Sequence, residues 1–234
     1  MILPWLSLPV SAENISISII DIAPSGFKED GKAKGATLEI ANAIAEKAGY
    51  TPTTKLRPFP RVVLELGNGK TDMSILLENT ALKDKVTIVA PIYEINSVVV
   101  SKSGVNIRSE TDLEDKKIGI IRHSSFYKKL TNHAQLNTRE VVNARQGLKM
   151  LRAGRIDALV AVDTSFYFML KTLGIPREEF ATPYVFDTKN IFLQVSNKFA
   201  DDSKVSKLRE IVEGMHKDGT IENILVRYAG PKEE

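Results

Sequence analysis

One pattern of residues occurs twice in the sequence, in LGNGKTDMSIL (66–76) and again in LRAGRIDALVA (151–161). Each copy reads Leu-x-x-Gly-basic-x-Asp and continues into apolar residues. Glycine readily adopts the positive φ at which many helices end, and a short apolar run is typical of a buried strand. Each copy therefore predicts a helix end followed by a buried strand. Two copies indicate two similar α/β lobes in one chain.

Short apolar strands and amphipathic helices alternate along the remaining sequence. The run ISISII at 15–20 has the period of two that a strand requires, whereas GATLEIANAIAEKAG has apolar residues at helical spacing before a glycine stop. This alternation favours an α/β fold with largely parallel sheets. Further strands are expected at 51–56, 71–77, 95–103, 116–121, 139–144 and 156–162, with helices beginning at Pro60, Ser124, Ala144 and Thr164 and two more at 204–217 and 220–228.

Composition excludes several classes of protein. The 234 residues contain 43% hydrophobic residues, which is enough for a sizeable core, and 32 basic against 29 acidic residues give a mixed surface. We therefore expect no nucleic-acid partner. The absence of cysteine rules out disulfides and thiolate metal sites, and the three histidines lack metal-ligand spacing. No metal and no cofactor are expected.

The first twelve residues, MILPWLSLPVSA, are apolar and are followed abruptly by polar Glu13 and Asn14. Val10-Ser11-Ala12 has the small-residue spacing of a signal-peptidase site. We interpret residues 1–12 as the remnant of a signal peptide, which predicts a secreted, periplasmic protein. The alternative is an N-terminal strand or a loosely packed extension.

Six segments occur in an order that resembles one family. They are APSGFKEDGKAKGATLEIANAIAEKAG, ELGNGKTDMSIL, NTALKDKVTIVAPIY, DLEDKKIGIIRHSSFYKKL, LRAGRIDALVAV and MHKDGTIENILVRY. Together they resemble the periplasmic solute-binding proteins of the polar-amino-acid type, which serve ABC importers. The resemblance runs from about residue 15 to residue 229.

The resemblance implies the two-lobed periplasmic-binding-protein fold of type II, an α/β architecture. Two mixed β-sheets flanked by helices would be joined by two hinge crossings. The first crossing would be INSVVVSKS (95–103), and the return would lie within YVFDTKNIFLQVSN (184–197). Lobe 1 would then comprise residues 13–99 and 190–234, and lobe 2 would comprise residues 100–189.

The resemblance also implies a function without chemistry. The lobes would close by hinge motion on a small polar solute, amino-acid-like or a carboxylate, and deliver it to the membrane permease of an ABC importer. Such a protein needs groups for both charges of a zwitterion and a surface for the side chain. We expect a monomer that is not an enzyme.

In lobe 1, the family motifs place six residues at the ligand. Phe27 matches an aromatic lid and Phe59 an aromatic wall, while Lys83 stands where the family commonly has an arginine that clamps a carboxylate. Arg61, or the nearby Arg57, would add an anion contact, and Glu78 with Asn79 would add polar groups. Each has a structural alternative: Phe27 packing on its own lobe, and Arg61 and Lys83 as solvated surface charges.

In lobe 2, the segment His123-Ser124-Ser125 follows a predicted strand and opens a predicted helix. Ser124 or Ser125 would cap this helix, and its free N–H groups would hold an anionic group. Asp163 is either the cap of the helix expected from Thr164 or the contact for a cationic group. The family usually has glycine at the position of His123, so an imidazole there would narrow the cleft or add a pH-sensitive contact.

Two other functions remain open on the sequence. A hydrolase pairing His123 with Ser124 or Ser125 is disfavoured, since adjacent residues rarely reach attack geometry and no Gly-x-Ser-x-Gly elbow is present. Periplasmic prephenate and arogenate dehydratases share the fold and would need Glu78 or His123 as a general acid. A receptor that presents its ligand to a sensor kinase or chemoreceptor is the remaining alternative.

Overall fold

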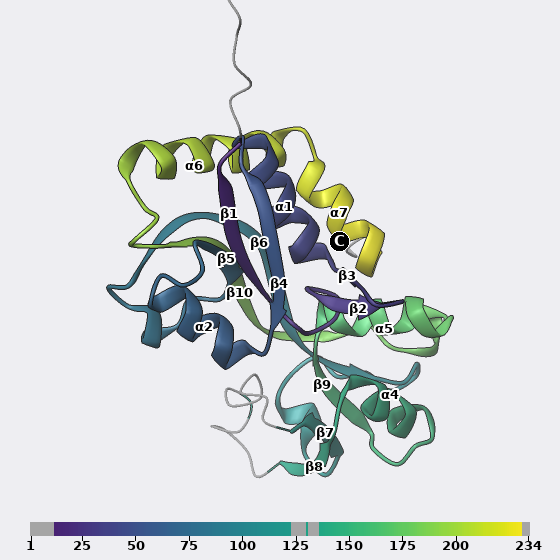
Figure 1. Ribbon diagram of the computed structural model, residues 1–234. Helices are drawn as coiled ribbons and strands as arrows, with labels where there is room; N and C mark the ends of the chain where they lie inside the picture. Colours follow the sequence, from purple (N-terminus) through teal and green to yellow (C-terminus); the bar gives the residue numbers. More distant parts are fainter. Residues whose placement is uncertain (1–11, 123–129, 131–135, 231–234) are drawn as a thin grey trace, which may run out of the picture.

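The computed structural model describes residues 12–122, 130 and 136–230, which form two α/β lobes stacked one above the other (Figure 1). The upper lobe corresponds to the expected lobe 1, and the lower lobe corresponds to the expected lobe 2. The strands are β1 (Asn14–Ile20), β2 (Phe27–Glu29), β3 (Lys32–Lys34), β4 (Thr51–Arg57), β5 (Met73–Leu76), β6 (Val86–Ser101), β7 (Lys117–Ile121), β8 (Asn137–Val141), β9 (Ala158–Val162) and β10 (Tyr184–Ser196). The α-helices are α1 (Ala36–Lys47), α2 (Phe59–Gly67), α4 (Ala144–Arg152), α5 (Asp163–Leu173), α6 (Asp202–Lys217) and α7 (Thr220–Ala229). Short 3-10 helices lie at Thr80–Leu82, Thr111–Leu113 and Arg177–Glu179.

The two long strands β6 and β10 carry the chain between the lobes. They pair antiparallel from Tyr184 opposite Val99 to Ser196 opposite Val86. One end of this ribbon pairs with β5 of the upper lobe, and the other end pairs with β9 of the lower lobe. The two sheets expected from the sequence are therefore joined edge to edge in one sheet, of order β4-β1-β5-β10-β6-β9-β7-β8 within the described residues. β10 agrees closely with the expected return at 184–197, whereas β6 begins at Val86, nine residues before the strand expected at 95–103.

Each lobe has its own apolar core. In the upper lobe, β1, β5 and one half of β6 and β10 pack against α1, α6 and α7. In the lower lobe, β9 and the other half of β6 are covered by α4 and α5 on one face, and by Ile107, Leu113 and Leu130 on the other. Because the cores are separate, the main connection between the two lobes is the pair of strands β6 and β10, through which the chain passes from one lobe to the other. No helix in the described part of the chain is long and apolar enough to cross a membrane.

The repeated sequence pattern has the same structure in both lobes. Gly69 and Gly154 both have a left-handed backbone, with φ of 67° and 66°. The aspartate that follows each glycine accepts a hydrogen bond from the backbone N–H of a parallel neighbouring strand: Asp72 from Ser16 and Asp157 from Lys117, both at 2.8 Å. In both lobes, the repeat therefore fixes where a strand starts beside its parallel neighbour, β5 beside β1 and β9 beside β7. Both aspartates have a structural role.

A buried carboxylate holds α2 against the upper sheet. Glu65 is only 5% exposed, and it accepts hydrogen bonds from Arg61 at 2.6 Å and from Arg57 at 3.3 Å. The hydroxyl of Ser18 in β1 donates to the same group at 3.3 Å. The hydrogen bond from Arg61 is the main reason that the pKa of Glu65 lies below its ordinary value, and burial acts against it.

We expect Glu65→Gln to lower the free energy of unfolding by about 1.5–3 kcal/mol at neutral pH, because charged hydrogen bonds to a buried carboxylate are lost. Denaturant unfolding measures this difference, and Glu46→Gln, an exposed carboxylate on α1, is the control. The folded pKa of Glu65 is lowered from 4.5, so its contribution is present above that pH. The difference between variant and parent should shrink as the pH falls through the folded pKa. Equal stability of the two variants would contradict this role.

Candidate ligand-binding cleft

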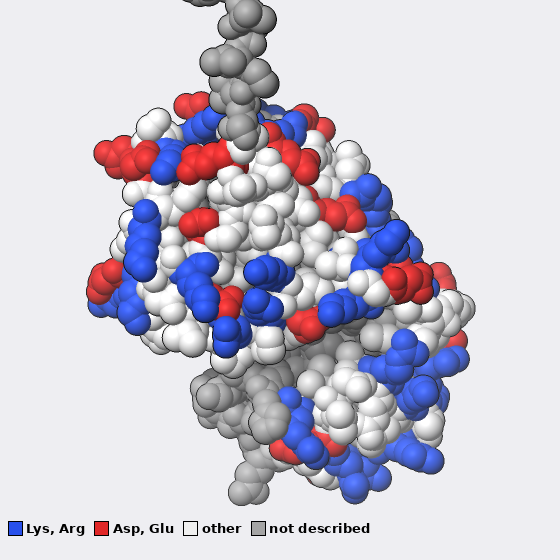
Figure 2. Space-filling model, viewed as in Figure 1, with Lys and Arg blue, Asp and Glu red and all other residues white. Residues whose placement is uncertain are grey.

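The carboxyl ends of three upper strands meet at one edge of the sheet, facing the lower lobe. β1 runs parallel to both β4 and β5, so the segments after Ile20, Arg57 and Leu76 leave from the same edge. Loops at such an edge are the usual place for ligands in α/β sheets. This topology gathers the sequence-predicted residues of lobe 1 from three distant segments. Figure 2 shows the surface hollowed between the two lobes, with side chains of both charges bordering the hollow.

Phe59 and Arg61 lie at the start of α2 and have different environments. The helix begins at Phe59, after Pro58 in the cap position and with Pro60 in its first turn, where a missing N–H costs nothing. The Phe59 side chain is 39% exposed and is available as a wall. The Arg61 guanidinium is half exposed but is already paired with Glu65. Two arginines thus share one carboxylate, which leaves a net positive charge beside Phe59.

The segment after β5 presents two opposite charges to solvent. Asn79 caps the 3-10 helix Thr80–Leu82 by accepting the N–H of Ala81 at 2.9 Å. Glu78 and Lys83 flank this turn, and both side chains are exposed. Among the described residues, neither side chain has a hydrogen bond or ion pair with another. The fold therefore uses Asn79 to shape the turn, and leaves Glu78 and Lys83 uncommitted.

Asp163 lies at the matching edge of the lower lobe, directly after β9. It is 6% exposed, and α5 begins at this residue with Val162 in the cap position, one residue earlier than the sequence suggests. Its carboxylate accepts the N–H of Thr164 at 2.6 Å and the side-chain amide of Asn96 at 2.9 Å. The carbonyl oxygen of that amide accepts the hydroxyl of Thr188 at 2.8 Å. Asp163 is thus tied to both crossing strands, Asn96 from β6 and Thr188 from β10.

Tyr93 lies beside this network on β6. Its hydroxyl shares a hydrogen bond of 2.7 Å with the hydroxyl of Thr37, at the start of α1. Burial raises the pKa of the Tyr93 hydroxyl, and the nearby charge of Asp163 acts in the same direction. Tyr93 is therefore a neutral hydrogen-bonding group that links α1 to the crossing.

Phe27 lies on β2 and packs between the lobes. Its ring centroid is 5.2 Å from that of Phe168 on α5 and 6.2 Å from that of Tyr228 on α7. Sequence reasoning offered a ligand lid or packing within one lobe as alternatives for Phe27. The structure places this ring in contact with an aromatic from each lobe.

The remaining predicted residues, His123, Ser124 and Ser125, lie outside the described residues. The chain leaves β7 at Arg122, whose guanidinium pairs with Glu140 at 3.0 Å. Because β7 and β9 are parallel neighbours, this exit lies at the same sheet edge as Asp163.

Four residues of this junction were not selected from the sequence: Asn96, Thr188, Phe168 and Tyr228. Asn96 interrupts a largely apolar strand, which is a usable signal. Thr188 lies within the polar run 187–190 of β10 and does not stand out from its neighbours. Phe168 and Tyr228 lie on helices where an aromatic residue normally indicates core packing. No sequence signal separates these two rings from ordinary core residues.

The sequence matches one known protein family over most of its length. The model of the bacterial extracellular solute-binding proteins, family 3, matches residues 17–231. A probable amino-acid-binding protein, YxeM, from Bacillus subtilis (strain 168) is 28% identical over 215 residues, covering 88% of this chain and 79% of that protein. A probable histidine-binding protein from Neisseria gonorrhoeae is 23% identical over 204 residues, covering 85% and 75%.

Solved structures show the same fold. Substrate-binding domain 2 of GlnP from Lactococcus lactis, in an open conformation, superposes with a TM-score of 0.76 at 20% identity, covering 97% of this chain and 99% of that chain. An ancestral arginine-binding protein bound to arginine gives a TM-score of 0.68 at 25% identity, covering 93% and 98%. These likenesses confirm the predicted type II fold, and the family of binding proteins confirms the expectation of binding without catalysis. The chain belongs to the bacterial extracellular solute-binding proteins, family 3.

Proposed function

We propose that this protein captures an amino acid, or a closely similar small carboxylate, between its lobes and delivers it to an ABC importer. Family membership supports a solute-binding role, and the names of the relatives support this class of ligand: an amino acid, histidine and arginine. A monomer exported to the periplasm fits this role. The proposed lobes are residues 13–99 with 190–234, and residues 100–189.

The observation that carries the proposal is the arrangement of charges at the junction. Lys83 and Glu78 are exposed and uncommitted on the upper edge, while Asp163 is held rigidly on the lower edge. A zwitterion needs both a cationic and an anionic partner, and closure of two lobes removes these partners from water. Charge-assisted hydrogen bonds made in such a closed site supply affinity and orientation without any chemical step.

The proposed roles follow from this arrangement. Lys83 provides a positive counter-charge for the carboxylate, as a point charge rather than the planar fork that an arginine would offer. Asp163 or Glu78 takes the amino group, and Phe27 and Phe59 form walls for the side chain. In the lower lobe, the proposal assigns the carboxylate to Ser124 and Ser125 and a neighbouring contact to His123, three residues that lie outside the described part of the chain. Arg61 and Asn79 complete the upper edge.

A thermal-shift panel tests the function directly. We expect at least one member of a panel of L-amino acids and small carboxylates, including L-arginine, L-histidine and L-cystine, to raise the melting temperature. A ligand at 100 times its dissociation constant stabilises a protein by about 2.7 kcal/mol, a shift that is easily measured. If no member of a broad panel shifts the melting temperature, the capture of amino acids is wrong.

The role of Lys83 is tested by Lys83→Ala. We expect the ligand found in the panel to bind about 10- to 150-fold more weakly, which corresponds to about 1.5–3 kcal/mol for a charged hydrogen bond. The melting temperature of the free protein should hardly change, because Lys83 makes no side-chain hydrogen bond with the described residues. Lys70→Ala removes an equally exposed lysine at the far end of α2 and should leave affinity unchanged. Equal losses in both variants would reject a direct contact.

The role of Asp163 is tested by Asp163→Asn, which keeps an oxygen to accept the N–H of Thr164. We expect affinity for the panel's amino-acid ligand to fall at least about tenfold, while affinity for its deaminated 2-hydroxy analogue stays within about twofold of the parent. Isothermal titration calorimetry measures both constants. A parallel loss for both compounds would mean that Asp163 serves only the start of α5 and the crossing strands.

A further inference from the structure

Helices α5 and α7 are anchored in different lobes yet lie against each other. Phe166 and Leu170 of α5 belong to the core of the lower lobe, whereas Ile221 and Ile224 of α7 belong to the core of the upper lobe. The two helices are in contact, to the right of the crossing strands in Figure 1, while α2 lies on the left. This contact is a second connection between the lobes, independent of β6 and β10.

The carboxyl end of α7 is held by two cations from the lower lobe. Lys171 donates from Nζ to the carbonyl oxygen of Arg227 at 2.5 Å, and Arg177 donates from Nη2 to that of Ala229 at 3.1 Å. The last carbonyls of a helix lack partners within the helix and carry its negative pole, so cations are favourable there. The Arg177 guanidinium also lies over the Tyr167 ring of α5, 4.2 Å from its centroid. The two hydrogen bonds run between the lobes, whereas the contact of Arg177 with Tyr167 lies within the lower lobe and orients the guanidinium.

An aromatic contact reinforces the same connection. The ring of Phe168 lies 5.2 Å from that of Phe27 and 6.4 Å from that of Tyr228. Tyr228 is fixed within the upper lobe, because its hydroxyl donates to Glu39 and accepts the N–H of Gly35 at 3.1 Å. Burial and this donation to Glu39 raise the pKa of Tyr228 to about 12, so it remains a neutral donor. Phe168 of the lower lobe thus packs on a rigid surface of the upper lobe.

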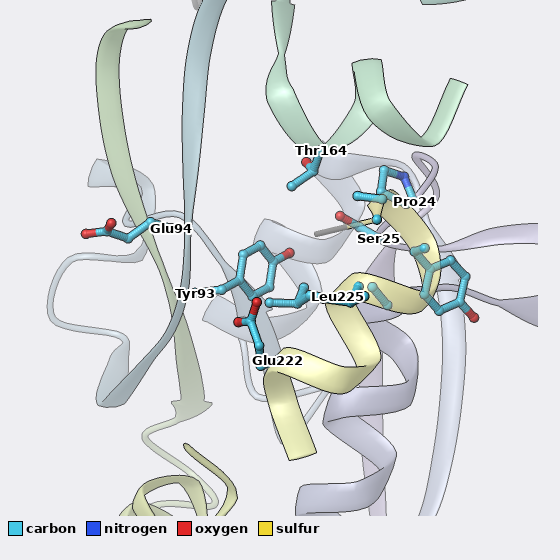
Figure 3. Close-up of a pocket in the computed structure, with 12 residues that line it drawn as sticks. Pro24, Ser25, Tyr93, Glu94, Thr164, Glu222 and Leu225 are labelled. Carbon is cyan, nitrogen blue, oxygen red and sulfur yellow. The ribbon is translucent and has the colours of Figure 1, made fainter. Parts of the chain in front are cut away.

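Beside this contact lies a small pocket of about 30 Å³. Figure 3 shows it between α7, the loop after β1, the crossing strand β6 and the start of α5, with Leu225, Tyr93 and Thr164 among the lining residues. Ser165, in the same turn of α5, donates to the carbonyl of Ala23 in the upper lobe at 3.2 Å.

The other side of the junction is open. Phe59, Glu78 and Lys83 are exposed there, and none makes a polar contact with the described residues of the lower lobe. Among the described residues, the contacts between the lobes lie on the α7 side of the crossing strands. A rotation that brings the open edges together must therefore strain or break the contacts on the α7 side. We propose that the contact of α5 and Arg177 with the carboxyl end of α7 is a latch that holds the lobes open.

On this proposal, Phe168, Lys171 and Arg177 are positioning residues. They set ligand affinity through the open–closed equilibrium and do not touch the ligand. The apparent dissociation constant of a ligand rises as the fraction of binding-competent protein falls, so weakening the latch tightens binding. A purely structural contact would instead lower stability and leave affinity unchanged or weaker. The inference rests on the proposed hinge closure, and deepens it by naming what opposes closure.

Inter-lobe distance can be measured without any ligand. The sequence has no cysteine, so Leu64→Cys on α2 and Thr138→Cys on β8 give two unique sites for spin labels, both exposed. Pulsed electron–electron double resonance then reports the distribution of distances between the two spin labels, and so between the lobes. We expect Lys171→Gln with Arg177→Gln to shift this distribution toward shorter distances in the free protein. Phe168→Leu should act in the same direction.

Tyr228→Phe is the matched control, because it removes hydrogen bonds to Glu39 and Gly35 that lie within the upper lobe but keeps the ring against Phe168. It should lower the melting temperature and leave the distances as in the parent. An unchanged or lengthened distribution in a folded Lys171/Arg177 variant, verified by circular dichroism, would overturn the latch.

Affinity gives an independent readout. Using L-arginine as the probe in isothermal titration calorimetry, we expect the Lys171/Arg177 variant to bind about 3- to 10-fold more tightly than the parent, and Tyr228→Phe to bind within about twofold. Weaker binding by the Lys171/Arg177 variant would show that these contacts favour the closed state, which contradicts the proposal. If L-arginine binds neither protein, the distances measured without ligand still test whether the contact holds the lobes open. Failure of the proposed function is therefore distinguished from failure of this inference.

Discussion

The antiparallel pairing of β6 with β10 is the interaction on which the other parts of the molecule depend. The two strands remain paired along their length, so backbone hydrogen bonds are satisfied through the stretch that belongs to neither core alone. At the crossing, Asn96 of β6 and Thr188 of β10 form a short chain of hydrogen bonds that ends on the buried carboxylate of Asp163. The position of α5, and with it the whole lower edge of the cleft, follows from this pairing. A buried carboxylate without these partners would be costly.

The distribution of charges separates structural from uncommitted groups. Glu65 is buried and consumes hydrogen bonds from Arg61 and Arg57, which fixes the start of α2 beside Phe59. Glu78 and Lys83, by contrast, are exposed on a turn that the Asn79 side chain shapes. Groups that the fold does not use are the ones available to a ligand. This division favours Lys83 over Arg61 as the principal counter-charge, although both were candidates on the sequence.

The same logic applies to the two sides of the junction. On the side of α2, the side chains of Glu78 and Lys83 face solvent and are available to a ligand. On the side of α7, cations of the lower lobe already satisfy the carbonyls of a helix end in the upper lobe. A hinge protein needs a free energy difference between its open and closed states that a ligand can overcome. Contacts of residues that do not bind the ligand provide a way to set that difference separately from the ligand's own contacts.

The sequence by itself determined the local architecture. Periodicity placed most of the strands and helices, although it missed β2, β3 and the first nine residues of β6. The repeated Leu-x-x-Gly-basic-x-Asp pattern predicted two lobes, and its glycines and aspartates are structurally equivalent. These features depend on neighbouring residues, for which the pattern of buried and exposed positions suffices. The start of α5 differed by one residue, because Asp163 and Thr164 were both plausible first residues of the helix.

Only the tertiary structure decided which distant side chains meet. Phe27, Phe168 and Tyr228 come from three separate parts of the chain and meet at the junction. The sequence offered a ligand lid or packing on its own lobe for Phe27, and only core packing for the other two. In the same way, no local pattern tells that Arg177 will reach the carbonyl of Ala229 rather than solvent. Periodicity reports which face of an element is buried, but not against what. That second fact depends on how the two lobes rest on the crossing strands, which is a property of the whole fold.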